Sequence, residues 1–351
     1  MADTIVIGAG VAGRWNWGYV FRRVLQALLI MWATFTLSFV ILFIIPGDPA
    51  LLMLGGGETT VTQEQLDVIN EEYGFDQPLM VQYLSYFGSL LMGDLGTSFH
   101  SGAPVVSLLT EALGSTLALV AFGTVLGIAL GLLVGCSAAY VKNPMLARFL
   151  ESIPSFSASL PNFWVALLLM QFLSFQLGWF PASGDRGFET LVMPGITLAI
   201  PAAASIAQVV SKSLRSAMDE PYIDVARSRG ASEPGVFFGH AFRNAILPAL
   251  TVLGLVVATM FVASAITETI FGRRGIGYML VQSITTQDIP VVQAAVIVAA
   301  GVYVLINLIV DLIYPFLDPR VTLAQGKRKG RRPAPASPAE AAVKPKSEMV
   351  P

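Results

Sequence analysis

Six long blocks of this sequence contain no charged residue, and they limit the possible folds more than any other feature. Each block has roughly the 20 residues that a helix needs to cross a hydrocarbon core about 30 Å thick. Only 13% of the chain is charged, whereas a soluble domain carries roughly 25%. We therefore predict an all-α membrane protein with six transmembrane helices, at residues 24–45, 115–141, 156–177, 191–210, 246–267 and 291–310.

Lysine and arginine are distributed unevenly around these blocks. If both termini lie in the cytoplasm, 18 of the 21 Lys and Arg residues face that side. The positive-inside rule selects this orientation. Residues 1–19 then form a flexible cytosolic lead-in and residues 20–321 the membrane domain. Residues 322–351 form a basic tail that we expect to be disordered, because it is rich in charge and proline.

The blocks also lack the ionisable residues that mark proton or ion pathways through membranes. Glu268 and Asp311 lie near block ends, where we expect water to reach them. A proton-coupled carrier is therefore disfavoured. Four neutral polar residues could line a polar pathway, although hydrogen bonding between helices is the more common role. These candidates are Gln171, Gln208, Gln293 and Asn307.

No phosphate-binding loop is present, because neither Lys-Ser pair follows the required glycines. Residues 5–13, IVIGAGVAG, match the dinucleotide-binding G-x-G-x-x-G pattern. That pattern works only in a β-α-β unit with an acidic residue about 20 positions on, and no acidic residue lies between Asp3 and Asp48. We expect no cofactor site and no ATP or Mg²⁺ site in this chain. A membrane-anchored oxidoreductase is the alternative that these glycines suggest.

Metal-binding and disulfide-forming residues are scarce. His100 and His240 are the only histidines, and Cys136 is the only cysteine. We therefore expect no metal site and no intrachain disulfide. Cys136 lies in an apolar block, where a free cysteine behaves as a small hydrophobe.

Residues 217–245 form a cytoplasmic segment between the fourth and fifth blocks, and turn signals divide it in two. Pro221 suits the first position of a helix, and Gly230 can adopt the left-handed conformation that ends one. Ser232 can cap a second helix. The first helix would have about 9 residues and a length of roughly 13 Å, which suits docking to a partner. Its apolar side would contain Tyr222, Ile223, Val225 and Ala226, and its charged side Asp224, Arg227 and Arg229.

The run Asp224-Val225-Ala226-x-x-x-Gly230 resembles the E-A-A-x-x-x-G loop of ABC importer permeases, with Asp for Glu and Val for the first Ala. FFGHAFRNAILP at 237–248 is similar to the extended form of that loop in peptide and nickel permeases. The resemblance implies that this segment is the coupling helix, which inserts into a groove on an ATPase subunit. The residues assigned to it are Tyr222, Asp224, Ala226, Arg227, Gly230, Ser232, His240 and Asn244.

Further fragments over residues 19–321 resemble the first permease of dipeptide and oligopeptide systems, and their order and spacing together are specific. They are IIPGDPA at 44–50, YGFDQPLMVQY at 73–83, GDLGTSF at 93–99, PVVSLLTEALGSTLAL at 104–119, PNFWVALLLMQF at 161–172, WFPASG at 179–184, ETIFGRRGIGYML at 268–280 and DLIYPFLDPRV at 311–321.

This resemblance implies a type I ABC importer permease in a bacterial cytoplasmic membrane. Its partners would be a second related permease, two cytoplasmic ATPase subunits that bind ATP and Mg²⁺, and an extracytoplasmic binding protein. No nucleic acid is implied, and the chain itself would catalyse no reaction. Peptides are the leading substrate, and nickel or another small solute is the alternative. An ATP-independent carrier is a less favoured one.

Residues 47–112 separate the first two blocks and carry helix signals. Thr62 and Gln65 fit a capping box, and Pro78 can start a second helix that runs to Gly93. We predict a folded extracytoplasmic cap, and the family resemblance gives it the role of receiving the binding protein. The residues of its second helix that suit an interface are Tyr83, Tyr86, Phe87 and Leu90.

Overall fold

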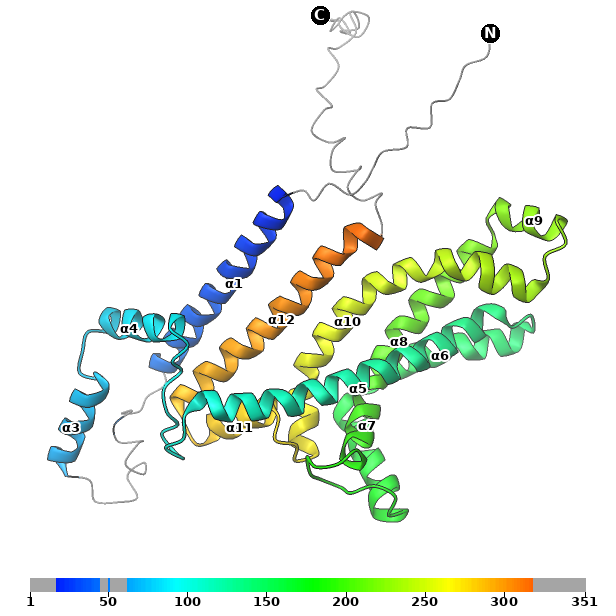
Figure 1. Ribbon diagram of the computed structural model, residues 1–351. Coiled ribbons are helices and arrows are strands. Elements are labelled where there is room, and N and C mark those ends of the chain that lie inside the picture. The colour runs from blue at the N-terminus through cyan, green and yellow to red at the C-terminus, as the bar shows by residue number, and fades with distance from the viewer. Residues whose placement is uncertain (1–16, 45–49, 51–61, 318–351) are drawn as a thin grey trace, which may run out of the picture.

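The computed structural model describes residues 17–44, 50 and 62–317, and most of them are helical (Figure 1). An isolated β-bridge joins Thr97 to Pro104. In chain order the helices are α1 (Trp17–Ile44), α3 (Gln63–Tyr73), α4 (Leu79–Leu91), α5 (Val105–Tyr140), α6 (Pro144–Ser159), α7 (Asn162–Leu169), the π-helix η1 (Met170–Gln176), α8 (Glu189–Met218), α9 (Pro221–Ser228), the π-helix η2 (Gly235–Ala241), α10 (Phe242–Ile270), α11 (Ile276–Thr285) and α12 (Ile289–Leu317).

Among the described residues, five helices contain an apolar stretch long enough to cross a membrane, and they match five of the predicted blocks. The block at 156–177 is not one straight helix, because α6 meets the α7–η1 pair at an angle of 100°. Pro161 explains the break. It has no N–H to donate, and Leu160 before it has an extended ψ of 128°. If the bent pair counts as one span, the number of spans is six.

A stripe of buried glycines on α5 allows α8 to approach closely at the centre of the bundle. A Cβ atom on Gly131 would lie 2.8 Å from Ile206 Cβ, and one on Gly127 would lie 3.0 Å from Ala202 Cβ. Small residues at four-residue spacing are typical of close helix packing in membranes. Side chains from α5, α8, α10 and α12 then form one buried apolar cluster.

The segment between α1 and α5 forms the helices that the sequence predicts. Thr62 and Gln65 form the expected capping box, in which the Thr62 N–H donates to Gln65 Oε1 at 3.1 Å. α4 starts directly after Pro78, as predicted, and ends at Leu91 rather than at Gly93. α4 lies between α3 and the end of α1, and α1 packs along α12 at the edge of the bundle (Figure 1).

Several predictions for the chain ends fall outside the described residues. These are most of the lead-in at 1–19, the glycines at 5–13 and the tail at 322–351. α1 begins at Trp17, so the last part of the predicted lead-in is helical.

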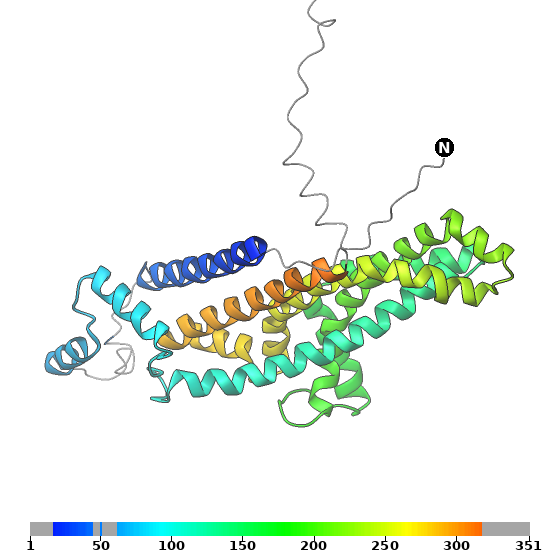
Figure 2. The same cartoon turned by 45° about the horizontal axis from the view of Figure 1, so that its top comes forward.

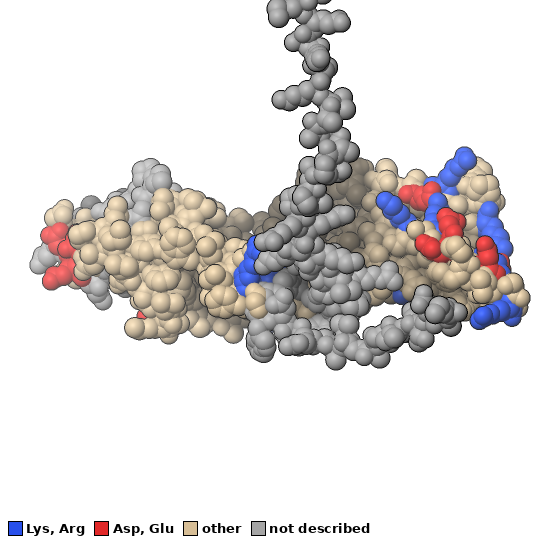
Figure 3. Space-filling view, turned by 90° about the horizontal axis from the view of Figure 1, so that it is seen from above, with Lys and Arg blue, Asp and Glu red and all other residues tan. Residues whose placement is uncertain are grey.

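Charge divides the molecule along its long axis. In the face shown in Figure 3, Lys, Arg, Asp and Glu gather at the α9 end, and acidic residues mark the α3 end. The described surface that is visible between them is mostly uncharged, apart from a basic patch over the start of α1. The 36 residues of α5 span about 54 Å, more than a bilayer core of about 30 Å. α5 is therefore longer than such a core, and it runs along the bundle to the end where α9 lies (Figure 2).

Candidate functional site

α9 is the helix predicted at the centre of the 217–245 segment, and local sequence signals set its bounds. Pro221 occupies its first position, after Glu220 in extended conformation. Gly230 follows its end with a φ of 85°, the left-handed conformation that favours glycine. The helix has 8 residues, close to the predicted length. Ser232 directly precedes the next helical turns, and its carbonyl oxygen accepts a hydrogen bond from the Val236 N–H at 2.8 Å.

The apolar residues of α9 do not form the single face that the sequence suggested. Ile223 and Ala226 are buried, in a cluster with Leu214 of α8 and Phe237 of η2. Tyr222 and Val225 point away from that cluster and are 36% and 49% exposed. At 100° per residue, the two pairs lie on neighbouring halves of a wide apolar arc, and only one half meets the bundle. Ile223 and Ala226 therefore anchor α9 to the bundle, and Tyr222 and Val225 remain on its exposed side.

Charged residues connect α9 to the turn that follows it. Arg227 lies 3.4 Å from Asp224 within α9 and 3.4 Å from Glu233 beyond Gly230. Lys142, after α5, lies 3.9 Å from Glu233. These side chains are substantially exposed, so each ion pair contributes little stability. Their effect is to orient α9 and its flanking turn.

The remaining predicted residues of this segment lie on the next helices. Asn244 of α10 donates from Nδ2 to the Tyr222 hydroxyl at 3.1 Å, which links the two halves of the segment. His240 lies in η2 with Nδ1 3.3 Å from the Gly235 carbonyl oxygen. All eight predicted residues therefore belong to one compact end of the molecule, from α9 to the start of α10.

Sequence reasoning missed the support beneath α9. Arg215 of α8 forms an ion pair with Glu151 of α6. Its guanidinium also donates to the Ala138 carbonyl oxygen of α5 at 3.0 Å. In the sequence, Arg215 is only one of the 18 basic residues expected on the cytoplasmic side. Its position between three long helices fixes the platform that carries α9.

A second polar cluster lies at the opposite end, around Glu268, and it corrects the expectation that water reaches this residue. Glu268 is 0% exposed. Its carboxylate accepts hydrogen bonds from Thr116 Oγ1 at 2.6 Å, from the Gly277 N–H at 2.9 Å and from the Tyr278 N–H at 3.3 Å. The Ile276 N–H donates to Thr116 Oγ1 at 2.9 Å. Glu268 and Thr116 thus satisfy the first three N–H groups of α11, which a helix leaves unpaired.

Two glycines allow α11 to reach this carboxylate. A Cβ atom on Gly275 would lie 2.2 Å from the Glu268 carboxyl carbon, and one on Gly277 would lie 2.4 Å from Ala265 Cβ. The G-I-G run within 268–280 is therefore a close-approach motif. The glycines were visible in the sequence, but the residue that they accommodate was not.

Arg273 lies beside this cluster and is also buried. Its guanidinium donates to the Thr190 carbonyl oxygen at 3.3 Å and to Ser115 Oγ at 3.1 Å. Burial lowers the pKa of Arg273 from its ordinary value, and the Glu268 and Asp185 carboxylates oppose that shift. Arg273 therefore joins Ser115 in α5 and the start of α8 to the turn before α11.

The four candidate pathway residues have different surroundings. Gln171 and Gln208 are exposed, and Asn307 donates from Nδ2 to the Tyr303 carbonyl oxygen of its own helix at 2.8 Å. Gln293 is 6% exposed, and its Nε2 has no hydrogen-bond partner among the described residues.

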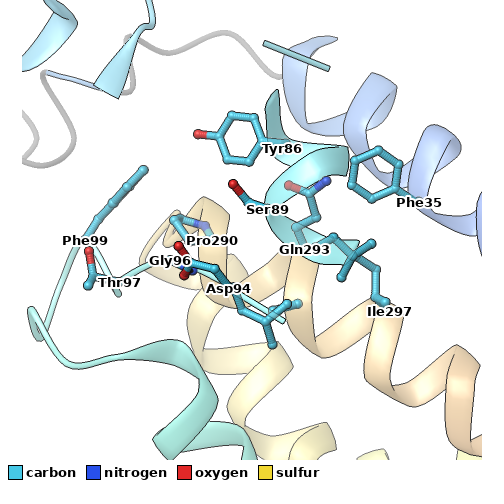
Figure 4. Close-up of a pocket in the computed structure, with 13 residues that line it drawn as sticks. Phe35, Tyr86, Ser89, Asp94, Gly96, Thr97, Phe99, Pro290, Gln293 and Ile297 are labelled. Atoms are coloured by element: carbon cyan, nitrogen blue, oxygen red, sulfur yellow. The ribbon is translucent and has the colours of Figure 1, made fainter. Parts of the chain in front are cut away.

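Gln293 lines a cavity of about 120 Å³ between α1, α4 and α12. In Figure 4 its amide points between Ser89 and Phe35, with Tyr86 above and Asp94 at the opposite wall. The lining is mainly aromatic and aliphatic, with one carboxylate. Among the described residues, no group of three or more His, Cys, Asp or Glu side chains is arranged to hold a metal ion.

Comparisons with known proteins cover nearly the whole chain. Residues 17–120 match the family described as binding-protein-dependent transport system membrane component, N-terminal. Residues 123–323 match the binding-protein-dependent transport system inner membrane component. A peptide transport system permease protein of Brucella abortus is 35% identical over 310 residues, covering 86% of this chain and 98% of the relative.

Two other relatives carry more specific names. An oligopeptide transport system permease protein of Bacillus subtilis is 32% identical over 314 residues, covering 86% of this chain and 98% of its own length. A dipeptide transport system permease protein of Lactococcus lactis is 33% identical over 306 residues, covering 87% of this chain and 99% of its own length. Among solved structures, an inward-facing methionine ABC transporter matches with a TM-score of 0.50 and 21% identity, over 60% of this chain and 96% of that one. That likeness supports the fold alone.

Proposed function

Because this chain belongs to the family of inner-membrane components of binding-protein-dependent transport systems, we propose that it is a permease subunit of an ATP-driven peptide importer. The observation that carries the proposal is its similarity to peptide, oligopeptide and dipeptide permeases over 98% or more of their length. As an integral membrane component, it would form half of the translocation pathway, and a second related permease would form the other half.

The family works with ATPase and binding-protein partners, and α9 is the element we assign to the ATPase. It is a short rod at the most highly charged end of the face shown in Figure 3. Its Tyr222 and Val225 side chains are available to a groove, and Asp224 stands beside them with 83% of its side chain exposed. Two such ATPase subunits would hold the ATP and Mg²⁺, and this chain would hold neither.

The orientation follows from this assignment. α9 and both termini lie in the cytoplasm, and α3 and α4 lie on the outer side, within an extracytoplasmic segment at 47–112 that receives the binding protein. The charge distribution supports it, since the basic residues around α9, α6 and the start of α1 obey the positive-inside rule. Residues 20–321 form the permease domain in this proposal, between a cytosolic lead-in and a basic tail at 322–351.

Coupling would pass from α9 into the bundle through the buried contacts of Ile223 and Ala226. These residues pack on the end of α8 and on η2, which continues directly into α10. Arg215 joins the same end of α8 to α5 and α6. When ATP binding closes the two ATPase subunits, a displacement of α9 would therefore move the joined ends of α5, α6 and α8, together with η2 and the start of α10. Of the candidate pathway residues, Gln208 lies on α8, Gln293 and Asn307 lie on α12, which packs against α10 and α5, and Gln171 lies on η1.

Uptake into proteoliposomes tests the proposal. The full complex, with ATP inside and the binding protein outside, should accumulate a labelled dipeptide or oligopeptide. The matched control is the same complex with an ATPase subunit that cannot hydrolyse ATP, and it should accumulate none. Uptake by this chain alone without ATP would contradict the importer assignment. Accumulation of Ni²⁺ but of no peptide would contradict the peptide assignment and leave the importer assignment intact.

A further inference from the structure

α4 carries an uncharged, outward-facing apolar surface that no part of the described chain covers. Its 13 residues, LMVQYLSYFGSLL, include no Asp, Glu, Lys or Arg. The outward side chains of Leu79, Met80, Leu84 and Leu91 are between 59% and 74% exposed. α3, immediately before it, has the opposite character, with acidic residues at four of its 11 positions. The composition of α3 therefore suits water, and the exposed side of α4 suits an apolar environment.

The inner side of α4 packs on a part of α1 that lies within the apolar span. The Tyr83 ring lies 5.3 Å from the Phe35 ring and 5.4 Å from the Phe39 ring, between centroids. The apolar span of α1 runs from Val20 to Leu42. At a rise of 1.5 Å per residue, Phe39 and Phe35 lie about 5 Å and about 10 Å inside its outer end. α4 is therefore level with the hydrocarbon region that α1 crosses.

The polar side chains on the inner side of α4 suit this depth. The Tyr83 hydroxyl and Thr36 Oγ1 of α1 lie 2.9 Å apart and share a hydrogen bond. Gln82 donates from Nε2 to the carbonyl oxygens of Phe75 and Gln77, at 3.0 and 2.8 Å. These bonds pair the Tyr83 hydroxyl and the Gln82 amide with protein groups, while Met80, Leu84 and Leu91 remain exposed.

We propose that α4 is an interfacial helix embedded in the outer leaflet, with Leu79, Met80, Leu84 and Leu91 against lipid acyl chains. Helices that lie in the membrane interface are buried about 5–10 Å into the boundary between headgroups and acyl chains, which matches the level set by Phe39 and Phe35. Leu37, Val40 and Ile41, within the apolar span of the adjoining α1, are also exposed. Lipid contact fixes the depth of α4, and α3 then extends into water with its acidic residues. This inference does not depend on which solute is transported.

Single spin labels at two positions, introduced in separate variants, test this inference on the complete transporter in nanodiscs. Cys136 is the only cysteine, so a Cys136→Ala background accepts one label at a time. Leu84→Cys reports on α4 and Val68→Cys on α3, and the two native side chains are equally exposed, at 59% and 58%. Power saturation should show more collisions with O₂ than with a water-soluble Ni²⁺ chelate at position 84, and the reverse at position 68.

Two results at position 84 would overturn the inference. Access to the Ni²⁺ chelate as high as at position 68 would place α4 in water. Low access to both reagents would mean that a protein partner, and not lipid, covers it. Met80→Cys repeats the measurement if Leu84→Cys does not assemble. ATP-driven peptide uptake is measured on the same labelled complexes after reconstitution into proteoliposomes, and its failure beside a lipid-exposed label would count against the proposed function alone.

Discussion

α9 and α11 are short helices toward opposite ends of the bundle (Figure 1), and each adjoins a turn with a left-handed glycine, Gly230 at 85° and Gly272 at 60°. The N–H groups that start α11 bond to two buried side chains, Glu268 and Thr116. α9 instead has exposed ion pairs around Arg227 and apolar side chains that face outward. The N–H groups at the start of α11 are therefore satisfied by buried groups of this chain, whereas the outer side of α9 combines exposed charged and apolar side chains, as expected of an element that binds a partner.

The same contrast predicts that the Glu268 cluster at α11 matters for the stability of the fold, and that α9 matters for coupling to the ATPase. Hydrogen bonds in a low-dielectric interior are strong, and leaving their donors unpaired is costly. Ion pairs exposed to water contribute between 0 and about 1 kcal/mol. Substitutions around Glu268 should consequently reduce stability, and substitutions on the outer side of α9 should affect assembly and transport while the permease remains folded.

Glu268→Ala should have the largest effect on stability. It leaves the Thr116 hydroxyl and the Gly277 and Tyr278 N–H groups without their acceptor, in a site with no access to water. The free energy of unfolding should fall by about 3 kcal/mol or more. Thermal unfolding of the purified complex, followed by intrinsic fluorescence, measures the change.

Glu233→Ala is the matched control at the α9 end. It removes the same type of side chain, but the Glu233 side chain is 46% exposed, and its ion pairs with Arg227 and Lys142 are long, at 3.4 and 3.9 Å. The stability loss should stay below about 1 kcal/mol. Equal losses for the two variants would show that the Glu268 cluster is not a structural centre.

Gly275→Ala should have the next largest effect. The added Cβ would lie 2.2 Å from the Glu268 carboxyl carbon, so either the carboxylate or the turn must shift. Overpacking of this kind costs about 1–3 kcal/mol. Gly239→Ala is the control, since a Cβ there meets no atom within 4 Å. Similar unfolding temperatures for both variants would contradict the close-approach role of Gly275.

The sequence predicted features whose causes are local. Uncharged blocks identify spans because hydrophobicity acts over about 20 consecutive residues. Pro221 and Gly230 identified α9 because each residue sets its own backbone conformation. The bend at Pro161 had a local signal too, but the apolar run on both sides of it favoured a single helix.

Features that depend on distant residues could not be predicted in this way. Glu268 lies at the end of an apolar block, which suggested contact with water. Its burial requires α11 to fold back and Thr116, 152 positions away, to meet it. The division of the α9 apolar residues into an inner and an outer pair likewise depends on where α8 and η2 lie, and that position is not encoded within the helix itself.

Asp224→Lys should change stability least and transport most clearly. The Asp224 side chain is 83% exposed, and its contact with Arg227 is 3.4 Å, so unfolding should shift by no more than about 0.5 kcal/mol. The reversed charge lies beside Tyr222 and Val225 on the surface assigned to the ATPase. Co-purification of the ATPase subunits, or ATP-driven peptide uptake, should therefore fall severalfold.

Asp67→Lys makes the same charge change on α3, at the other end of the molecule, where Asp67 accepts a hydrogen bond only from Gln63 of its own helix among the described contacts. This control should leave ATPase association unchanged, since it alters the net charge of the chain equally but lies far from α9. A loss of association in both variants would trace the effect to overall charge. Normal association and uptake with Asp224→Lys would remove α9 as the docking element and leave the fold and the Glu268 cluster untouched, because those depend on contacts within this chain.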